Sequence, residues 1–409
     1  MSRAADMAPF QVMAKPIGPR CNIDCTYCYY LDKEKLYPET KKFRMPDKVL
    51  ERFIGDYISS QTEGGGKEID FCWQGGEPTI LGVEYFRKVM ALQERYRPNG
   101  VVIRNSIQTN GTLLDREWAR FLTDNEFLVG ISIDGPKHIH DRYRMDRAGR
   151  PTFNAVMRGL DLLQSFGVQY NVLTAVHKHS ALKPKQVYSF LRGKGVEYIQ
   201  FIPIVERATG GSVPSAVPDP GGAVEDSGVT PWSVSPRAYG KFLCDIFDMW
   251  VKRDVGRIFV QMFDVHLGLW MGLPSSLCVF SEECGPALAL EHNGDLFSCD
   301  HFVYPEYRLG NITETPMAEM ARSARQTEFG HYKASALPRQ CRRCRFRFAC
   351  NGGCPKHRFA QTGDGEKGLN YLCDAYRRFF RHAGPKLEEM AGFLRAGLPA
   401  ATVMTGAAR

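Results

Sequence analysis

The sequence has no long apolar run, no long basic run and no internal repeat. Nowhere do about 18 apolar residues follow one another, so a membrane-spanning helix is not expected. Residues 1–10 lack an apolar core of signal-peptide length. The net charge of +8 is mild for 409 residues, and without a basic cluster it gives no indication of nucleic-acid binding. These absences predict a cytoplasmic protein that binds neither a membrane nor a nucleic acid.

Cysteine is the residue that the chain uses most distinctively. Thirteen cysteines without a secretory signal favour metal or redox chemistry in a reducing cytosol over a disulfide framework. Three lie near the front of the chain, and eight lie between Cys278 and Cys373. Only Cys72 and Cys244 stand apart, and we predict that both are buried core residues.

The first 205 residues alternate short apolar runs with amphipathic segments. Strands are expected at residues 11–15, 69–73, 101–108, 127–133, 170–176 and 198–204, and helices at 46–61, 83–96, 115–125, 153–166 and 185–194. Six β/α units in order predict a parallel sheet with right-handed crossovers. A doubly wound sheet and a barrel both satisfy this pattern. In either fold the chemistry belongs at the carboxyl ends of the strands.

The front cysteines form a C-x3-C-x2-C run of Cys21, Cys25 and Cys28. Three thiolates can hold three irons of a cubane cluster and leave the fourth iron open to a small molecule. A zinc knuckle that lacks one ligand, or a chance cluster, is the alternative. The run resembles the signature of radical S-adenosylmethionine (SAM) enzymes, in which the open iron chelates SAM. The resemblance implies a partial (β/α)6 barrel, and the aromatic Tyr27 also fits it.

Further motifs follow the ends of the expected strands. Gly76 and Glu77 belong to a GGEP run that resembles the family's contact with the amino group of SAM, although a tight turn is the alternative. Ser132 and Arg144 match positions that meet the carboxylate and ribose of SAM in similar enzymes, and a solvated loop is the alternative. Val205 matches a backbone contact to adenine, and alone it would be interpreted as a core valine.

The eight cysteines of the C-terminal region provide two complete four-thiolate sets. Their C-x2-C pair also suits structural zinc, so their spacing alone leaves zinc and iron–sulfur clusters open. The region resembles the SPASM extension of radical SAM proteins, which carries two auxiliary [4Fe–4S] clusters. With the front cluster, the resemblance implies three [4Fe–4S] clusters. The two implied ligand sets are Cys278, Cys284, Cys299 and Cys354, and Cys341, Cys344, Cys350 and Cys373.

Asp300 directly follows Cys299, where an arbitrary aspartate would cap a turn or face solvent. The position matches the base of the anaerobic sulfatase-maturating enzymes. The resemblance to that family covers residues 10–385 and includes QGGEPT at 74–79, QTNG at 108–111, SIDGP at 132–136, QFI at 200–202 and RLGNI at 308–312. It implies oxygen-independent oxidation of a cysteine or serine of a sulfatase to Cα-formylglycine. A flavodoxin- or ferredoxin-type electron donor is the implied partner.

Two other functions remain open from the sequence. The first is a radical SAM/SPASM enzyme that forms thioether or carbon–carbon links on a peptide. Such enzymes usually carry an N-terminal peptide-recognition domain, which we do not expect because nine residues precede Phe10. The second is a zinc-stabilised interaction protein.

The expected domain organisation follows from these motifs. We predict a partial barrel at 1–235 with a loop insertion at 207–232, a linking helical segment at 236–277, a SPASM domain at 278–385 and a tail at 386–409. The insertion is rich in glycine, proline, serine and valine and has no apolar period. A helix at 236–251 is expected to lead into the cysteine-rich region.

Overall fold

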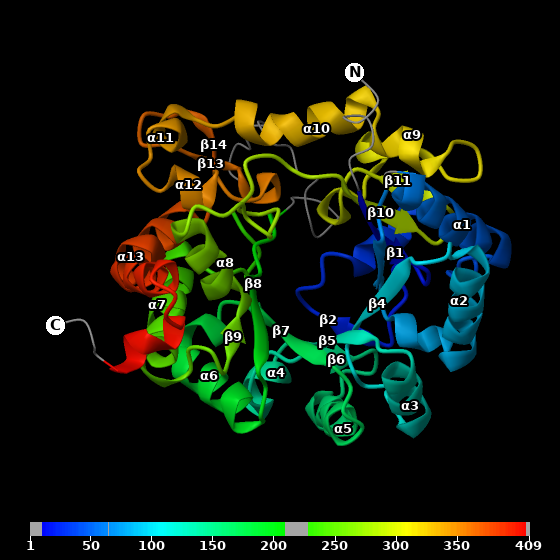
Figure 1. Ribbon diagram of the computed structural model, residues 1–409, viewed down its shortest axis with the longest axis horizontal. Helices are drawn as coiled ribbons and strands as arrows, with labels where there is room; N and C mark the ends of the chain where they lie inside the picture. Colours follow the sequence, from blue (N-terminus) through cyan, green and yellow to red (C-terminus); the bar gives the residue numbers. More distant parts are fainter. Residues whose placement is uncertain (1–9, 64, 209–227, 406–409) are drawn as a thin grey trace. The chain divides into compact units, whose positions relative to one another are not determined.

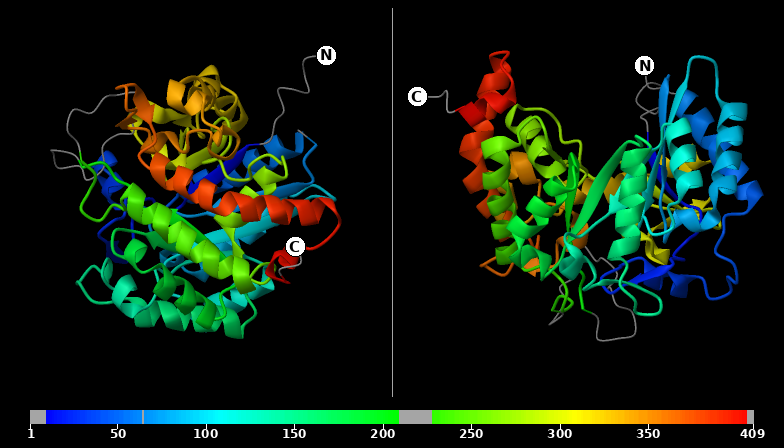
Figure 2. Two further views of the ribbon diagram at one scale, coloured as in Figure 1. Left: turned by 90° about the vertical axis from the view of Figure 1, so that its left-hand side faces the viewer. Right: turned by 90° about the horizontal axis from the view of Figure 1, so that it is seen from below.

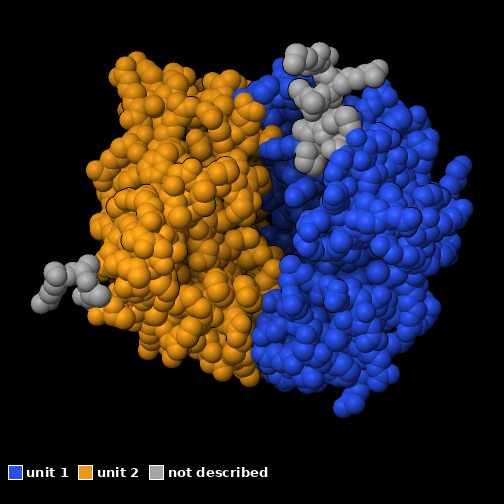
Figure 3. Space-filling model, viewed as in Figure 1, with its two compact units in different colours: residues 1–132, 144–170, 285–331 blue, residues 133–143, 171–284, 332–409 orange. Residues whose placement is uncertain are grey.

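The computed structural model describes residues 10–63, 65–208 and 228–405, and these fall into two compact units (Figure 3). Unit 1 comprises the described residues within 1–132, 144–170 and 285–331, and unit 2 those within 133–143, 171–284 and 332–409. In the described part of the chain, every helix is too short or too polar to cross a bilayer.

Unit 1 is built on a largely parallel sheet with the strand order β12-β11-β10-β1-β3-β4-β5 (Figure 1). Its strands are β1 (Gln11–Lys15), β3 (Glu68–Trp73), β4 (Val102–Thr109), β5 (Leu128–Ser132), β10 (Ala287–Glu291), β11 (Asp295–Phe297) and β12 (Arg308–Asn311). β1, β3, β4 and β5 are neighbours in chain order and pair in parallel. A doubly wound sheet would reverse its order at a switch point, so this unit has the strand order of a barrel.

Helices cover one face of the unit 1 sheet, because alternate residues of its strands are apolar. These helices are α1 (Asp47–Glu63), α2 (Val83–Tyr96), α3 (Arg116–Asp124), α5 (Phe153–Ser165) and α9 (Met317–Ala321). Phe71 and Trp73 point from β3 toward the helices, where Phe53 of α1 lies 5.6 and 5.8 Å from their ring centroids. The opposite face of the same strand is left for polar side chains.

A separate two-stranded sheet pairs β2 (Ile23–Cys25) with β6 (Arg144–Asp146) in unit 1. The pairing is antiparallel and puts Cys25 opposite Arg144. It thereby ties the front cysteine run to the loop that carries the predicted SAM-binding arginine.

Unit 2 contains the parallel strands β7 (Tyr170–Val176), β8 (Tyr198–Pro203) and β9 (Phe259–Val260) and a helical layer. Its helices are α4 (Lys137–His140), α6 (Pro184–Gly193), α7 (Pro236–Arg253), α8 (Gln261–Trp270), α11 (Arg339–Arg342), α12 (Arg347–Cys350) and α13 (Cys373–Arg395). The long helices α7 and α13 lie side by side (Figures 1 and 2). Phe247 of α7 and Phe379 of α13 meet there with ring centroids 5.8 Å apart. A short hairpin of β13 (Ala360–Gln361) and β14 (Lys367–Leu369) follows α12, and α10 (Ala324–Ser335) begins in unit 1 and ends in unit 2.

The expected strands and helices of the first 205 residues are confirmed, with bounds that differ by at most two residues. Strands at 11–15 and 170–176 and the helix at 83–96 agree at both ends. The helix expected at 236–251 is α7 and continues to Arg253. Helix α13 was missed because Pro385 interrupts its pattern, although the helix continues to Arg395.

Residues 209–227 of the expected loop insertion lie outside the described residues. At its described ends, Arg207 and Val229 form an antiparallel bridge, and Thr230 N donates to Glu206 O over 2.9 Å. These contacts bring the two ends of the segment together. The domain boundaries given above stay a prediction.

Candidate active site and iron–sulfur ligands

The front cysteines lie in unit 1 on the segment that follows β1. Cys28 N donates to Cys25 O over 2.9 Å and closes a tight turn. Asn110, just after β4, donates through Nδ2 to Cys21 Sγ over 3.6 Å. Burial, Glu77 and Cys28, in decreasing order of influence, raise the pKa of the Cys21 thiol to about 12. The first and third thiols are therefore close enough to repel each other when ionised.

Gly76 allows the cysteine segment to lie directly on the turn after β3. Its amide donates to Gly18 O over 2.7 Å. A Cβ at position 76 would lie 1.9 Å from Arg20 O, one residue before Cys21. The close approach predicted for this glycine exists, and the group that approaches is the backbone of the cysteine segment. Whether SAM also contacts Gly76 stays a prediction.

Glu77 is completely buried and joins the ends of two neighbouring strands. Its Oε1 accepts hydrogen bonds from Thr79 N at 3.1 Å, Thr79 Oγ1 at 2.5 Å and Thr109 Oγ1 at 2.7 Å, and its Oε2 accepts one from Asn110 N at 2.6 Å. Burial raises its pKa in spite of these four donors. This carboxylate fixes Asn110, and through it Cys21. Its predicted contact with SAM stays a prediction.

The other predicted SAM contacts fall in both units. In unit 1, Arg144 Nη1 donates to Tyr27 Oη over 2.9 Å, and both side chains are buried. Ser132 ends β5 and accepts a hydrogen bond from Gln108 Nε2 over 3.2 Å. Val205 follows β8 in unit 2 and is buried. The structure therefore brings Tyr27 and Arg144 together, and the SAM-binding roles of these residues stay predictions.

Asp300 carries a buried ion pair in unit 1. Lys15, the last residue of β1, forms an ion pair with its Oδ1 and is fully buried, and Tyr29 Oη donates to its Oδ2 over 2.5 Å. Burial opposes ionisation of this carboxyl, but Lys15, His301 and Tyr29 outweigh burial and lower its pKa to about 2. Asp300 is therefore a carboxylate at neutral pH, held from both sides.

Lys15 is itself held in place by neighbouring strands. Its Nζ donates to Gln74 Oε1 over 3.1 Å and lies 3.8 Å from the centroid of the Tyr30 ring. Tyr30 in turn donates to Glu291, which pairs with Lys15 in the parallel register of β1 and β10. The fully buried carboxylate of Glu291 is thus linked to Asp300 through Tyr30 and Lys15.

Cys72 corrects one expectation. We predicted a core residue, but its side chain is only partly buried and lies on the face of β3 opposite Trp73. The pKa of its thiol is raised, mainly by burial. Ser106 and Lys15 lower this pKa, and Asp300 raises it. Cys72 therefore lies beside the ion pair at Asp300. Cys244, the second thiol predicted to be in the core, is buried as expected.

One thiol set surrounds a cavity in unit 2. Cys341, Cys344, Cys350 and Cys373 line a space of about 490 Å³. Burial, followed by the other three thiols, raises the pKa of Cys350 to about 12. These four cysteines are the second set implied by the sequence, and the structure brings them together.

Three members of the other set lie together in unit 2. Burial raises the pKa of Cys284 to about 12, with further upward contributions from Cys354 and Cys278. Cys299, the fourth member, belongs to unit 1, where it precedes Asp300. Lys333 Nζ donates to the carbonyls of Cys278, Val279 and Ser281, and so holds the segment that carries the first two thiols.

Arg358 is a buried cation that influences thiols of both sets. Its side chain donates to the carbonyls of Lys333, Asn351, Gly352 and Gly353. Burial lowers its pKa, while Cys341, Cys284, Cys354 and Cys350 raise it. The guanidinium is thus placed where negative charge on either thiol set stabilises it.

The donor sets fit iron–sulfur clusters. Among the described residues, no three cysteine, histidine, aspartate or glutamate side chains converge closely enough to hold a single metal ion. A structural zinc ion needs four ligands within about 2.3 Å, whereas the cavity in unit 2 has room for a multi-atom centre. Burial keeps these thiols protonated when no cation is near, and iron supplies the charge that stabilises thiolates.

Comparisons with known proteins agree with this geometry. The sequence profile of the Radical SAM superfamily matches residues 16–191, and that of SPASM, an iron–sulfur cluster-binding domain, matches residues 283–345. The chain is a radical SAM enzyme with a SPASM extension. SAM and iron–sulfur clusters are its cofactors, and the predicted partial (β/α)6 barrel with a cysteine-rich SPASM domain is confirmed.

Relatives identify the family more closely. A serine-type anaerobic sulfatase-maturating enzyme of Bacteroides thetaiotaomicron is 47% identical over 93% of this chain and 91% of its own length. A cysteine-type anaerobic sulfatase-maturating enzyme of Clostridium perfringens is 34% identical over 95% of this chain and 100% of its own. The solved structure of native anSMEcpe with bound AdoMet has a TM-score of 0.81 at 34% identity and covers 94% of this chain and 100% of its own. The chain belongs to the family of anaerobic sulfatase-maturating enzymes.

Four residues of these sites escaped the sequence analysis. Lys15 appeared there only as the last residue of an expected strand, and Tyr29, Lys333 and Arg358 were not singled out. A lysine that ends an apolar strand is a signal for Lys15, because a strand buried on both faces has no solvated place for a charge. Nothing comparable marks Lys333 or Arg358.

Proposed function

We propose that this chain oxidises a serine or cysteine side chain of a sulfatase to Cα-formylglycine without oxygen. The observation that carries the proposal is Asp300, a carboxylate held by Lys15 and Tyr29 directly after Cys299. Loss of a hydrogen atom, an electron and a proton converts a serine side chain to the aldehyde. The same losses convert a cysteine side chain to a thioaldehyde, which water hydrolyses to the aldehyde with release of hydrogen sulfide. A partly buried carboxylate that is ionised at neutral pH can accept that proton.

When bound, SAM and the clusters supply the radical that removes the Cβ hydrogen atom and a destination for the remaining electron. The chain's own residues then have three tasks. Tyr29 and Lys15 orient the two oxygens of Asp300, and the raised pKa of Tyr29 keeps its phenol protonated as a donor. Glu77 and Asn110 fix Cys21, and the buried pair of Tyr27 and Arg144 presents a cation for a carboxylate. Asp300 accepts the substrate proton.

We further infer a one-electron carrier of the flavodoxin or ferredoxin type as partner and the cytoplasm as location. None of the thirteen cysteines, all in described residues, forms a disulfide, which supports a reducing compartment. Reductive cleavage of SAM needs one electron per event, which supports a carrier. The carrier's identity is a separate question from the reaction itself.

Anaerobic incubation with two matched peptides tests the proposed reaction. The peptides carry a sulfatase motif and differ only in serine or cysteine at the target position, and a third with alanine there is the control. We expect an aldehyde, captured by a hydrazine reagent and located by mass spectrometry, on at least one of the first two. The higher identity to the serine-type relative makes the serine peptide the first to test. A crosslinked product without aldehyde would contradict the proposal.

A further inference from the structure

An arginine-rich surface surrounds the cavity of the second thiol set in unit 2. Arg343 and Arg345 lie between Cys341 and Cys350, while Arg377 and Arg381 follow Cys373 on α13. All four line the cavity together with the thiols. Arg343, Arg345 and Arg381 are exposed, and Arg377 is half-buried. We call these four residues the arginine rim.

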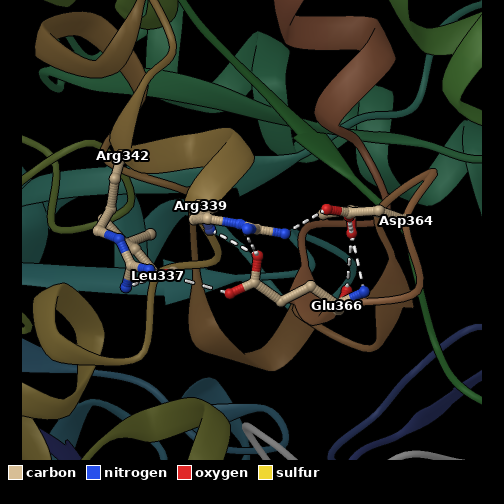
Figure 4. A network of polar contacts seen from close by, with 6 residues as sticks. Leu337, Arg339, Arg342, Asp364 and Glu366 are labelled. Carbon is tan, nitrogen blue, oxygen red and sulfur yellow. Dashed lines mark hydrogen bonds and ion pairs between the residues drawn. The ribbon is translucent and has the colours of Figure 1, made fainter.

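The arginine rim lacks the acidic partners that some other arginines of unit 2 have. Among the described residues, none of its four members forms an ion pair. Elsewhere in unit 2, Arg347 pairs with Glu282. Arg339 pairs with Asp364 and Glu366 (Figure 4). The acidic residue Asp374 directly follows Cys373. Its single negative charge is smaller than the positive charge of the four arginines. Clustered like charges repel one another, and an acidic partner relieves that repulsion.

An exposed aromatic residue accompanies the arginine rim. Phe348 lies on α12, two residues before Cys350, and is 48% exposed. Its ring packs edge-on against Trp270 with centroids 4.8 Å apart. An aromatic residue beside a charged rim is a common arrangement at protein–protein interfaces.

We propose that the arginine rim and Phe348 dock an acidic one-electron carrier protein, which exchanges electrons with the chain through the cluster expected in the adjoining cavity. The proposal rests on the proposed function. After the Cβ hydrogen atom has left, the substrate loses one more electron and one proton as the aldehyde of a serine substrate, or the thioaldehyde of a cysteine substrate, forms. The proton goes to Asp300, and the electron reduces one oxidised carrier. No bond of the carrier forms or breaks in this step.

Direct binding of a flavodoxin to the anaerobically reconstituted full-length chain tests the proposal. One variant carries Arg343→Gln, Arg345→Gln, Arg377→Gln and Arg381→Gln, and a second carries only Arg343→Gln and Arg345→Gln. The matched control is Arg116→Gln/Arg120→Gln, which removes two exposed arginines of α3 that also lack ion pairs among the described residues. Iron content and the visible spectrum establish that each variant retains its clusters.

We expect the fourfold variant to raise the dissociation constant at low salt at least about tenfold and to flatten its salt dependence. The second variant should lie between it and the wild type, and the control should match the wild type. A fourfold variant with wild-type affinity and intact clusters would overturn the proposal. So would preferential binding of an oligonucleotide that competes with the carrier. The binding measurement contains no substrate peptide, so its result does not depend on formylglycine formation. The peptide assay described above tests that reaction separately.

Discussion

The two units bury positive charge in different ways. In unit 1, buried Lys15 faces the carboxylate of Asp300 and is linked through Tyr30 to Glu291, so the chain supplies its own counter-charges. In unit 2, buried Lys333 and Arg358 bind mainly backbone carbonyls, and the negative groups near them are cysteine thiols. Lys15 therefore has its counter-charges in the fold itself, whereas Lys333 and Arg358 gain theirs when the neighbouring thiols ionise on a metal cluster.

Removing the three front thiols should have the largest effect. It tests whether the auxiliary clusters form without the front cluster. After anaerobic reconstitution we expect about twelve irons per chain, because each of three cubane clusters holds four. The triple variant Cys21→Ala/Cys25→Ala/Cys28→Ala should keep about eight irons and lose SAM cleavage completely. Iron analysis and detection of 5′-deoxyadenosine provide the measurements. Retained cleavage would contradict the assignment of the open iron to these thiols.

Asp300→Asn tests the completed charge pair of unit 1. The change keeps size and polarity but removes the base, so formylglycine should fall at least about a hundredfold. Hydrogen abstraction should survive, and 5′-deoxyadenosine should still form in the presence of peptide. Asp295→Asn is a matched control on β11, where the carboxylate pairs with Arg308 instead. Loss of unit 2 irons in Asp300→Asn would instead indicate a structural role.

Local apolar patterns predicted the strands and helices of the first 205 residues, whereas the barrel arrangement, the division of the cysteines into ligand sets and the role of Asp300 came from the family resemblance. The ligand sets and the role of Asp300 stay predictions. The sequence did not predict the partners of these residues. Lys15 and Asp300 are 285 positions apart, and parallel pairing of β1 with β10 is what brings their segments together. We expected Gly76 to make room for a ligand, but the backbone at Arg20, about fifty residues upstream, occupies the space beside it. Contacts between distant segments leave no periodic signal in either of them.

Gly76→Ala tests this last point. Its Cβ would overlap Arg20 O, so the front cysteine segment must move. We expect loss of the front cluster's irons and a lower Tm, with the unit 2 irons retained. Gly392→Ala in α13 is the control, because a Cβ there meets nothing within 4 Å. Full iron content with weakened SAM binding would favour a direct contact between Gly76 and the ligand.

Arg358→Gln tests the incomplete charge of unit 2. The substitution removes a buried cation and several backbone hydrogen bonds, so the unfolding free energy should fall by about 2–4 kcal/mol. The auxiliary clusters should be harder to reduce, because a positive charge near their thiols is lost. Arg339→Gln removes an exposed arginine of the same unit (Figure 4) and should cost less than about 1 kcal/mol. Thermal unfolding and potentiometric titration of the clusters measure the two effects. Equal losses of unfolding free energy in the Arg358→Gln and Arg339→Gln variants would contradict a special role for Arg358.

Lys15→Met should change the pH dependence of formylglycine formation more than the rate of this reaction at neutral pH. Burial alone raises the pKa of Asp300, and Lys15 is the strongest of the groups that lower it to about 2. In the wild type the ionised carboxylate stabilises the fold above its unfolded pKa, and this contribution is lost as the pH falls through the folded pKa. Without Lys15 the pKa should rise above the ordinary aspartate value, so the acid limb of formylglycine formation should move upward by at least about one pH unit. Lys33→Met is the control, since it removes a buried lysine that lies over the Tyr304 ring. An acid limb that stays in place in Lys15→Met would show that this lysine does not set the proton affinity of Asp300.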